Sequence, residues 1–203
     1  MPALLFTIIP NGVVCGHQVK KELRKQALAA RFDLPIEERL AKSSRIERLL
    51  FALPEFRAAR TVMFYASFRT EVETGPMIRR AIDEGKRVVL PKVKGKELAL
   101  YAIRDFDQDV APGAWDIPEP VNGKPVDVRS VDIIIMPGAV FDEGGNRLGY
   151  GAGFYDRLLA DYHGATVALA FELQIVPEVP AAQHDVPVKR IVTEKRVITT
   201  QRA

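Results

Sequence analysis

The chain has 203 residues, of which 47% are hydrophobic, and its 29 Lys and Arg exceed its 26 Asp and Glu to give a net charge of +3. This length and composition are typical of a globular protein that buries roughly 70% of its unfolded surface. The basic and acidic residues are interspersed, so the sequence does not indicate a nucleic-acid partner. The lone cysteine, Cys15, excludes an intrachain disulfide and a cysteine-rich zinc site, as is typical of a cytoplasmic protein.

The first sixteen residues, MPALLFTIIPNGVVCG, are apolar but do not have the pattern of a membrane or targeting segment. No Lys or Arg precedes the apolar run, Pro10 and Gly12 interrupt it, and it is too short to span a bilayer. We expect residues 1–16 to be a disordered tail or a misassigned start, with lipidation at Cys15 as a weaker alternative. Residues 17–203 are expected to form one domain without a membrane partner.

Hydrophobic periodicity and Gly or Pro boundaries predict an alternation of helices and strands. In chain order, the expected elements are a helix over 17–31, a helix over 35–53, a strand over 61–66, a helix over 75–85, strands over 87–90, 98–103 and 133–136, a helix over 154–162, and strands over 166–171, 191–193 and 197–199. The strand at 87–90 is expected to end before Pro91. The stretch 105–129, rich in Pro and Gly, is expected to be irregular and either lines the site or forms a surface loop. The apolar stripe of the first helix is expected to consist of Val19, Leu23, Ala27 and Ala30.

Strands that alternate with helices favour an α/β fold. We therefore predict a three-layer domain with a mainly parallel sheet and helices on both faces. Ligands of such sheets bind at the carboxyl ends of the strands, which would bring together the segments 68–74, 137–156 and 172–185. The middle segment is expected to hold a glycine-rich phosphate loop at this carboxyl edge.

The middle segment, PGAVFDEGGNRLGYGAGFYD, has five glycines within ten residues, between a predicted strand and a predicted helix. Glycine permits positive φ and close approach of a ligand, and N–H groups at a helix N-terminus attract anions. The spacing matches neither a Walker A loop nor a dinucleotide fingerprint. The loop is therefore either a structural connector or a phosphate cradle. Arg147 favours the cradle because a guanidinium can hold phosphate oxygens, the alternative being a surface ion pair.

Several charged residues accompany this loop. Asp156 at the start of the following helix, and Asp142 within the loop, either stabilise local structure or bind Mg²⁺ beside a nucleotide. Asp185 is the candidate for a second carboxylate, or else an ordinary loop residue. Lys20 and Arg24 lie one helical turn apart and are either surface cations or polyphosphate contacts.

Two further residues have both an ordinary and a functional interpretation. Glu71 follows the first predicted strand, in a loop before a helix, where acidic residues are common. Trp115 is the single tryptophan and either anchors a proline-rich loop in the core or stacks on a flat heterocycle. Composition and spacing alone do not decide between these interpretations.

Taken together, these segments resemble the 5-formyltetrahydrofolate cyclo-ligase family over residues 20–193. The shared motifs occur in the family's order: K-x-x-L-R at 20–24, E-V-E-T at 71–74, W-D-I-P-E-P at 115–120, M-P-G through R-L-G-x-G-x-G-F-Y-D at 136–156, Q-I-V at 174–176 and H-D at 184–185. The long motif at 136–156 is the most specific of them, whereas K-x-x-L-R alone would carry no weight.

The resemblance implies a set of ligand contacts. The implied ATP contacts are Lys20, Lys21, Glu22, Leu23, Arg24, Arg147, Leu148, Gly149, Tyr150, Gly151, Ala152, Gly153, Phe154 and Tyr155, among which Arg147 and Lys20 are the implied catalytic residues. The implied folate contacts are Ala66, Glu71, Trp115, Tyr150, Gly151, Ala152, Gly153 and Phe154. The implied Mg²⁺ ligands are Asp156 and Asp185.

It also implies a ligase that uses Mg²⁺ and ATP to convert 5-formyltetrahydrofolate, with or without a polyglutamate tail, into 5,10-methenyltetrahydrofolate. ADP and phosphate are released through a phosphorylated formyl intermediate, and we expect a monomeric cytoplasmic enzyme of one-carbon metabolism. Two residues depart from the family pattern: Ala152 stands where lysine is common, and Phe154 where tyrosine is common. The alternatives are an isomerase or acyl-transfer enzyme with Glu71 as base, and a folate- or nucleotide-binding protein without turnover.

Overall fold

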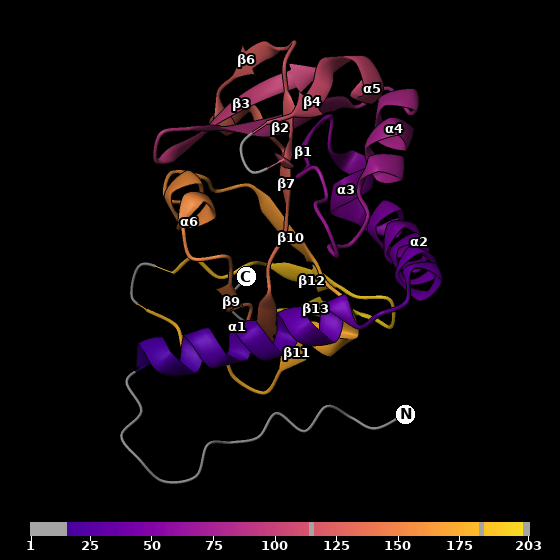
Figure 1. Ribbon diagram of the computed structural model, residues 1–203. Coiled ribbons are helices and arrows are strands. Elements are labelled where there is room, and N and C mark those ends of the chain that lie inside the picture. The colour runs from indigo at the N-terminus through magenta and orange to yellow at the C-terminus, as the bar shows by residue number, and fades with distance from the viewer. Residues whose placement is uncertain (1–15, 114–115, 183–184, 201–203) are drawn as a thin grey trace, which may run out of the picture.

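The computed structural model describes residues 16–113, 116–182 and 185–200, and its centre is one large sheet (Figure 1). Eight strands lie in the order β13-β12-β10-β7-β1-β2-β3-β6. Five are parallel: β12 (Arg190–Val192), β10 (Ala165–Leu169), β7 (Ile133–Met136), β1 (Thr61–Met63) and β2 (Arg87–Lys94). Antiparallel strands flank them: β13 (Val197–Thr199) on one side, and β3 (Glu97–Ile103) with β6 (Lys124–Val126) on the other. The predicted α/β fold with a mainly parallel sheet is confirmed.

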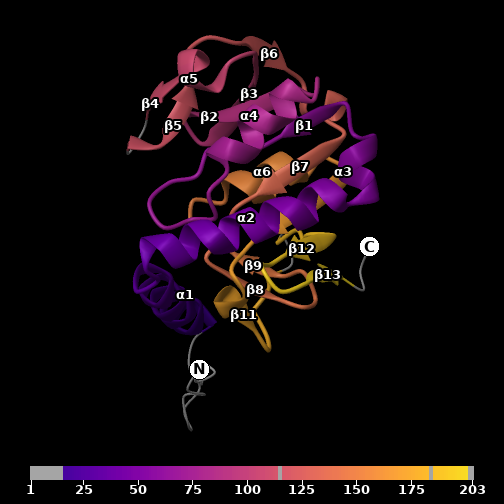
Figure 2. The same cartoon turned by 90° about the vertical axis from the view of Figure 1, so that its right-hand side faces the viewer.

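Helices cover both faces of this sheet (Figures 1 and 2). The helices α2 (Ile36–Ala52), α3 (Pro54–Ala58) and α4 (Gly75–Asp83) pack on one face, and α6 (Phe154–Leu159) packs on the other. The four apolar residues of β7 are all buried, because successive side chains of a strand point to opposite faces and both faces of the sheet are covered. Ile133 and Ile135 join the core beneath α2, whereas Ile134 and Met136 join the core beneath α6.

A smaller sheet lies beside the main one, in the order β11-β8-β9. It consists of β8 (Val140–Asp142), β9 (Arg147–Leu148) and β11 (Ile175–Val176), and it packs against α1 (Gly16–Phe32) (Figure 1). The contact forms a third core cluster, which consists of Ala27, Ala139, Val140, Leu148, Val176 and Val179. Of the predicted stripe on α1, Ala27 belongs to this cluster and Leu23 packs against it, together with Leu28. This packing fixes which face of α1 is turned toward the segment 137–156.

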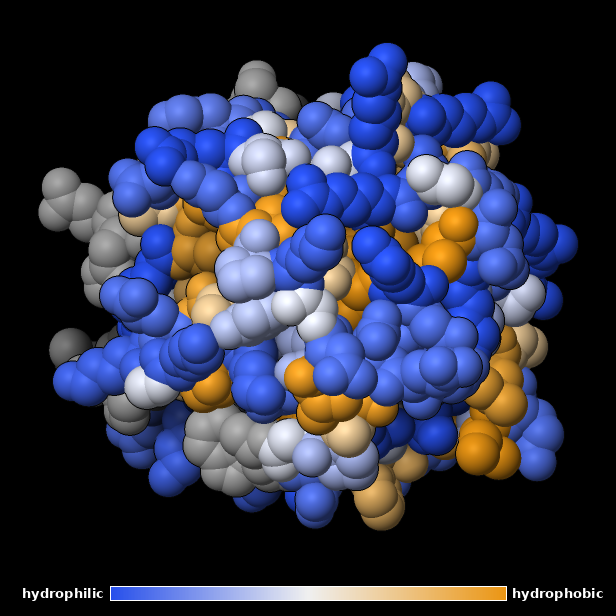
Figure 3. Space-filling view, turned by 90° about the horizontal axis from the view of Figure 1, so that it is seen from above, coloured by the Kyte–Doolittle hydropathy of each residue, from blue (hydrophilic) through white to orange (hydrophobic). Residues whose placement is uncertain are grey.

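The stretch 105–129 is more regular than predicted. It holds α5 (Phe106–Asp109), a hairpin of β4 (Val110–Pro112) and β5 (Pro118–Pro120), the edge strand β6 and the 3₁₀ turn η2 (Val128–Ser130). Proline is compatible with these short edge strands because no second neighbour requires its missing N–H. The surface seen from this side is mostly hydrophilic, with apolar areas between the hydrophilic side chains (Figure 3). A short, charged edge of this kind resists pairing with other chains.

Three predicted boundaries were wrong by three residues or more. The strand expected to end before Pro91 continues to Lys94, since beyond Val89 the described ladder of β2 is with β3 alone and Pro91 can occupy it. The strand expected over 61–66 ends at Met63. The helix expected over 154–162 ends at Leu159, because the chain turns there toward β10. Across the described residues, no helix combines the length and the apolar character needed to cross a bilayer.

Candidate functional site

Helix α1 directs three basic side chains at segments that lie far along the sequence. Lys20 Nζ forms an ion pair with Asp185 at 3.1 Å, and Arg24 Nε donates to the carbonyl of Gly149 at 2.8 Å. Arg31, two turns after Arg24, is buried and reaches the carbonyl of Gly138. Residues four and seven positions apart share one face of a helix. The expected pair Lys20 and Arg24 is therefore part of a longer basic edge of α1.

The glycine loop, residues 149–153, connects β9 to α6. Gly151 and Gly153 have φ values of 104° and 66°, a region that side chains with a Cβ rarely adopt, so these two glycines are needed for the path of the loop. Helix α6 has only six residues, so its dipole is shorter than the predicted helix implied. Anion binding at this loop would rest mainly on its backbone and on the neighbouring arginines.

Arg147 lies on the inner side of the loop, with only 5% of its side chain exposed. Its Nη2 donates to Asp156 Oδ1 at 2.7 Å, and its guanidinium lies 5.6 Å from the centre of the Tyr155 ring. Its Nε is buried without a hydrogen-bond partner in the described part of the chain. A buried donor without an acceptor is rare in native proteins and costs stability. The arrangement fits a site in which a ligand oxygen completes the coordination of the guanidinium.

A buried carboxylate lies under the same loop. Glu71 is 7% exposed and its Oε1 accepts a 2.6 Å hydrogen bond from the Tyr150 hydroxyl, while Oε2 accepts one from the backbone N–H of Phe68. Arg31, 3% exposed, donates to the same hydroxyl at 2.8 Å and to the Thr70 hydroxyl at 3.0 Å. Tyr150 thus links the glycine loop to the segment after β1 and to α1.

Burial controls the ionisation of these groups. Desolvation raises the pKa of the Glu71 carboxyl, while the Tyr150 hydrogen bond and the charge of Arg31 act against the rise. Burial, together with the charge of Glu71, also raises the pKa of Tyr150 and of Tyr155, so both phenols stay protonated at neutral pH. Glu71 can therefore accept hydrogen bonds from a ligand, and it holds its proton more readily than an exposed glutamate.

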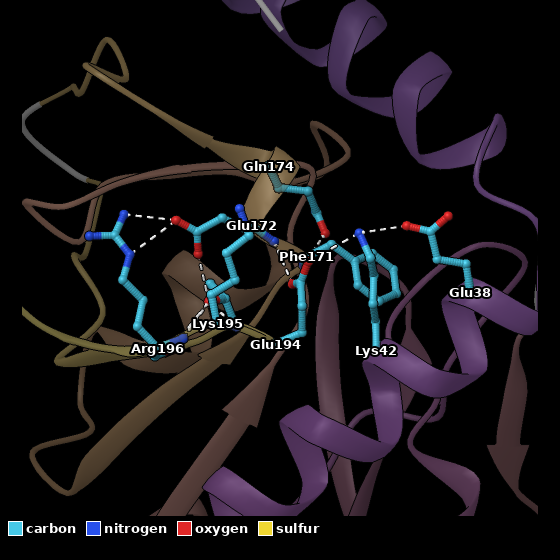
Figure 4. A network of polar contacts seen from close by, with 9 residues as sticks. Glu38, Lys42, Phe171, Glu172, Gln174, Glu194, Lys195 and Arg196 are labelled. Atoms are coloured by element: carbon cyan, nitrogen blue, oxygen red, sulfur yellow. Dashed lines mark hydrogen bonds and ion pairs between the residues drawn. The ribbon is translucent and has the colours of Figure 1, made fainter. Parts of the chain in front are cut away.

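A polar network beside this site supports the turn after β7 (Figure 4). Lys42 on α2 pairs with Glu194 at 3.1 Å, and Glu194 accepts the backbone N–H of Glu172 at the start of η3 (Glu172–Gln174). Partial burial disfavours the ammonium of Lys42, but Glu194 and Glu38 outweigh it and raise its pKa. Gln174, the last residue of η3, donates to the carbonyls of Gly138 and Ala139. The network therefore helps to fix the turn that Arg31 also binds.

The structure brings some predicted residues together and leaves others outside this arrangement. Lys21 is exposed, Glu22 accepts from Gln26, and Leu23 and Leu148 pack in the third core cluster. Ala66 is buried three residues after the end of β1, and Phe154 lies under Arg157. Ala152 is exposed. Trp115 lies outside the described residues.

Asp142 is the last residue of β8, where the chain turns toward β9. Its carboxylate accepts from the backbone and the side chain of Asn146 and from the backbone N–H of Val179, which matches the structural alternative. Asp185 also accepts the backbone N–H of Ala182 at 2.7 Å. Asp156 and Asp185 therefore each pair with a cation that was itself a predicted phosphate contact.

Sequence reasoning missed Arg31 and the structural role of Gln174. Arg31 had a usable signal, because it lies in the same predicted helix as Lys20 and Arg24 and seven residues after Arg24. Two helical turns return a side chain to nearly the same face. Gln174 was seen only as part of a family motif, and its contacts are to backbone carbonyls, which leave no pattern in a sequence.

The fold is that of the methenyltetrahydrofolate synthetases. The structure matches the NMR structure of Aquifex aeolicus 5,10-methenyltetrahydrofolate synthetase with a TM-score of 0.82 and 38% identity, over 90% of this chain and 93% of that one. The family model for the 5-formyltetrahydrofolate cyclo-ligase family matches residues 16–194, and the chain belongs to this family.

Two curated relatives carry the same family name. The 5-formyltetrahydrofolate cyclo-ligase of Mus musculus is 28% identical over 94% of this chain and 98% of the mouse protein. The 5-formyltetrahydrofolate cyclo-ligase of Escherichia coli strain K12 is 32% identical over 73% of this chain and 85% of its own length. The similarity to the mouse protein spans nearly the full length of both chains.

Proposed function

We propose that this chain converts 5-formyltetrahydrofolate into 5,10-methenyltetrahydrofolate with ATP and Mg²⁺, releasing ADP and phosphate. The observation that carries the proposal is the meeting of α1 with the glycine loop. Lys20 and Arg24 reach this region from α1, Arg147 precedes the loop, and a buried donor of Arg147 has no partner in the described residues. Cations and backbone N–H groups around a glycine loop suit the phosphates of a nucleotide.

The proposed reaction proceeds through a phosphorylated formyl group. The formyl oxygen attacks the γ-phosphorus of ATP, the bond from that phosphorus to the bridging oxygen breaks, and ADP leaves. The N10 nitrogen of the folate then attacks the formyl carbon, the carbon–oxygen bond to phosphate breaks, and N10 loses its proton as the ring closes. Such a transfer depends on positioning and charge stabilisation. Arg147 and Lys20 supply the positive charge, and the reaction requires no protein nucleophile.

Asp156 and Asp185 are the residues proposed to hold Mg²⁺. Magnesium in nucleotide sites usually takes one or two protein carboxylates and completes its coordination with phosphate oxygens and water. The described residues contain no cluster of three or more metal-binding side chains, and the two carboxylates fit a metal of this kind because their oxygens are hard ligands. When bound, the metal would neutralise phosphate charge.

Glu71 is proposed to orient the folate. The pterin ring carries neighbouring N–H donors, and a buried carboxylate is a matching acceptor because its hydrogen bonds are shielded from water. In the described structure Tyr150 donates to Glu71, so the phenol holds the place of one such donor. Ala66 lies in the segment that connects β1 to Glu71 and is proposed to line the same pocket.

The proposal is tested by mixing the purified chain with 5-formyltetrahydrofolate, Mg²⁺ and ATP and following the absorbance band of methenyltetrahydrofolate. A rise that requires ATP and matches ADP release one to one is expected. Absorbance that rises equally without ATP would contradict the proposed mechanism. Bound folate without any rise would favour a binding protein without turnover, and Ala152→Lys would then test whether the missing lysine is the cause.

A further inference from the structure

A second arginine contacts the glycine loop from the opposite end. Arg157 lies on α6, and its Nη2 donates to the carbonyl of Ala152 at 2.8 Å. Its Nε donates at 2.8 Å to the carbonyl of Lys96, in the turn between β2 and β3. The guanidinium carbon lies 5.4 Å from the centre of the Phe154 ring. These contacts hold the charge of Arg157 directly over the end of the loop.

Space for this guanidinium depends on the last glycine of the loop. A Cβ added to Gly153 would lie 2.9 Å from Arg157 Nη1, closer than real contacts allow. Nη1 itself donates no hydrogen bond within the residues that the structure describes. The two N–H groups of Arg157 Nη1 therefore lie above Gly153 and can bind an acceptor from solution.

Charge neutralisation separates the basic residues around the loop into two groups. Lys20 is paired with Asp185, and Arg147 is paired with Asp156. Arg24 and Arg157 bind loop carbonyls, and neither pairs with a carboxylate in the described ranges. The loop therefore carries an uncompensated arginine at each end, one at Gly149 and one at Ala152. A polyanion is the ligand class that uses two such charges together.

We propose that Arg157 is a further binding residue for the polyphosphate of the nucleotide. It would bind at the outer end of the glycine loop, at Ala152, as Arg24 would bind at the inner end, at Gly149. The inference rests on the proposed ATP-dependent function and adds a residue to it. The short side chain of Ala152 leaves the outer end of the loop open to Arg157. Arginine suits this role because its planar fork binds a carbonyl with one edge and phosphate oxygens with another.

The alternative role for Arg157 is purely mechanical, since its two carbonyl contacts tie the loop to the β2–β3 turn. Arg157→Gln separates the two roles because an amide still donates to a carbonyl but carries no charge. Arg157→Lys retains the charge and loses the fork. Arg129→Ala is the matched control, since Arg129 is an exposed arginine of η2 whose hydrogen bonds within the described residues all go to Asp127.

The experiment measures binding of ATP, ADP and AMP to each full-length variant by calorimetry, in the presence of Mg²⁺ and without folate. Arg157→Ala and Arg157→Gln are expected to weaken ATP binding by about 10- to 100-fold and AMP binding by less than about threefold, because AMP lacks the terminal phosphates. Arg157→Lys is expected to fall between these variants and the unmodified chain. Ala152→Lys added to Arg157→Ala is expected to restore part of the ATP affinity.

Equal losses for ATP and AMP, or a glutamine variant that binds ATP like the unmodified chain, would overturn the proposal and leave the mechanical role. Unfolding in urea shows whether each variant is folded, and the lysine variant tests the proposal if the alanine variant is not. Failure of the unmodified chain to bind ATP would instead reject the proposed function, and the role of Arg157 with it. Because binding is measured without turnover, the two failures are distinguishable.

Discussion

Replacement of Tyr150 by phenylalanine removes one oxygen atom from the centre of the candidate site. The phenol accepts a hydrogen bond from Arg31 at 2.8 Å and donates one to Glu71 at 2.6 Å. The variant keeps the ring and the glycine loop but leaves a buried guanidinium N–H and a buried carboxylate oxygen without this partner. Both hydrogen bonds involve a charged group, a kind worth roughly 1.5–3 kcal/mol.

The net effect is smaller than the sum of the two bonds. Tyr150 as a residue is 54% exposed, so water can replace part of what the hydroxyl supplied. We expect the free energy of unfolding to fall by about 1–3 kcal/mol. For a chain of this size, each kcal/mol lowers Tm by roughly 2–4 °C, so Tm is expected to fall by about 2–12 °C.

The same substitution changes the ionisation of Glu71. The Tyr150 hydrogen bond lowers the pKa of Glu71 against the burial that raises it, so its removal lets this pKa rise further. A raised carboxyl pKa means that the folded chain binds the proton more tightly, and its contribution to stability falls as pH rises from the ordinary pKa of 4.5 through the folded value. If ionised Glu71 binds folate, the acid limb of kcat/KM for folate moves to higher pH.

The assay compares thermal unfolding and the pH profile of kcat/KM for Tyr150→Phe with those for Tyr101→Phe. Tyr101 contacts Lys94 through its ring, and its hydroxyl has no hydrogen-bond partner among the described residues. The control is expected to change neither quantity. A Tyr150→Phe variant with the Tm and the acid limb of the unmodified chain would refute the reasoning. The hydroxyl would then affect neither the stability of the fold nor the pKa of Glu71.

Two further substitutions test the surroundings of the loop. Asp156→Asn keeps an acceptor for Arg147 but removes the negative charge. It is expected to lower Mg²⁺- and ATP-dependent turnover by at least about 100-fold and the free energy of unfolding by roughly 1–3 kcal/mol. Unchanged dependence of turnover on Mg²⁺ would remove Asp156 from the proposed metal site. Gln174→Ala removes the acceptor of the Phe171 N–H and the side-chain donor to the Gly138 and Ala139 carbonyls, of which Gly138 still accepts from Arg31. It is expected to lower the free energy of unfolding in urea by roughly 2–5 kcal/mol, and a loss below about 0.5 kcal/mol would show that the turn does not depend on it.

The elements that were predicted correctly are those whose own residues determine them. The run Ile133–Met136 is apolar at every position, is buried on both faces and was predicted with its observed bounds. The small sheet was missed because β9 and β11 have two residues each, and so short a strand exists only through partners far along the chain. The hairpin of β4 and β5 was missed because its prolines and glycines favour turns.

The candidate site shows the same division. Helical spacing was enough to place Lys20 and Arg24 on one face, and the glycine content was enough to locate the loop. The ion pairs of Arg147 with Asp156 and of Lys20 with Asp185 were not predicted, because they depend on contacts across 9 and 165 residues. The contacts of Arg157 are to backbone carbonyls, which any residue can supply, and those of Arg31 reach side chains 39 and 119 residues further along the chain.

The position of α1 has a consequence for how this protein becomes functional during its synthesis. Its side chains contact partners 107, 119, 125 and 165 residues further along the chain. Contacts of such long range form late in folding because long loops must close first. Helix α1 is therefore among the last of the described elements to find its place, and its apolar face lacks part of its partners until residue 179 of the third core cluster has been synthesised. A chain that stops before residue 175 lacks β11, Val179 and the Asp185 partner of Lys20, so α1 would have an incomplete surface to pack on and activity would require the segment 175–185.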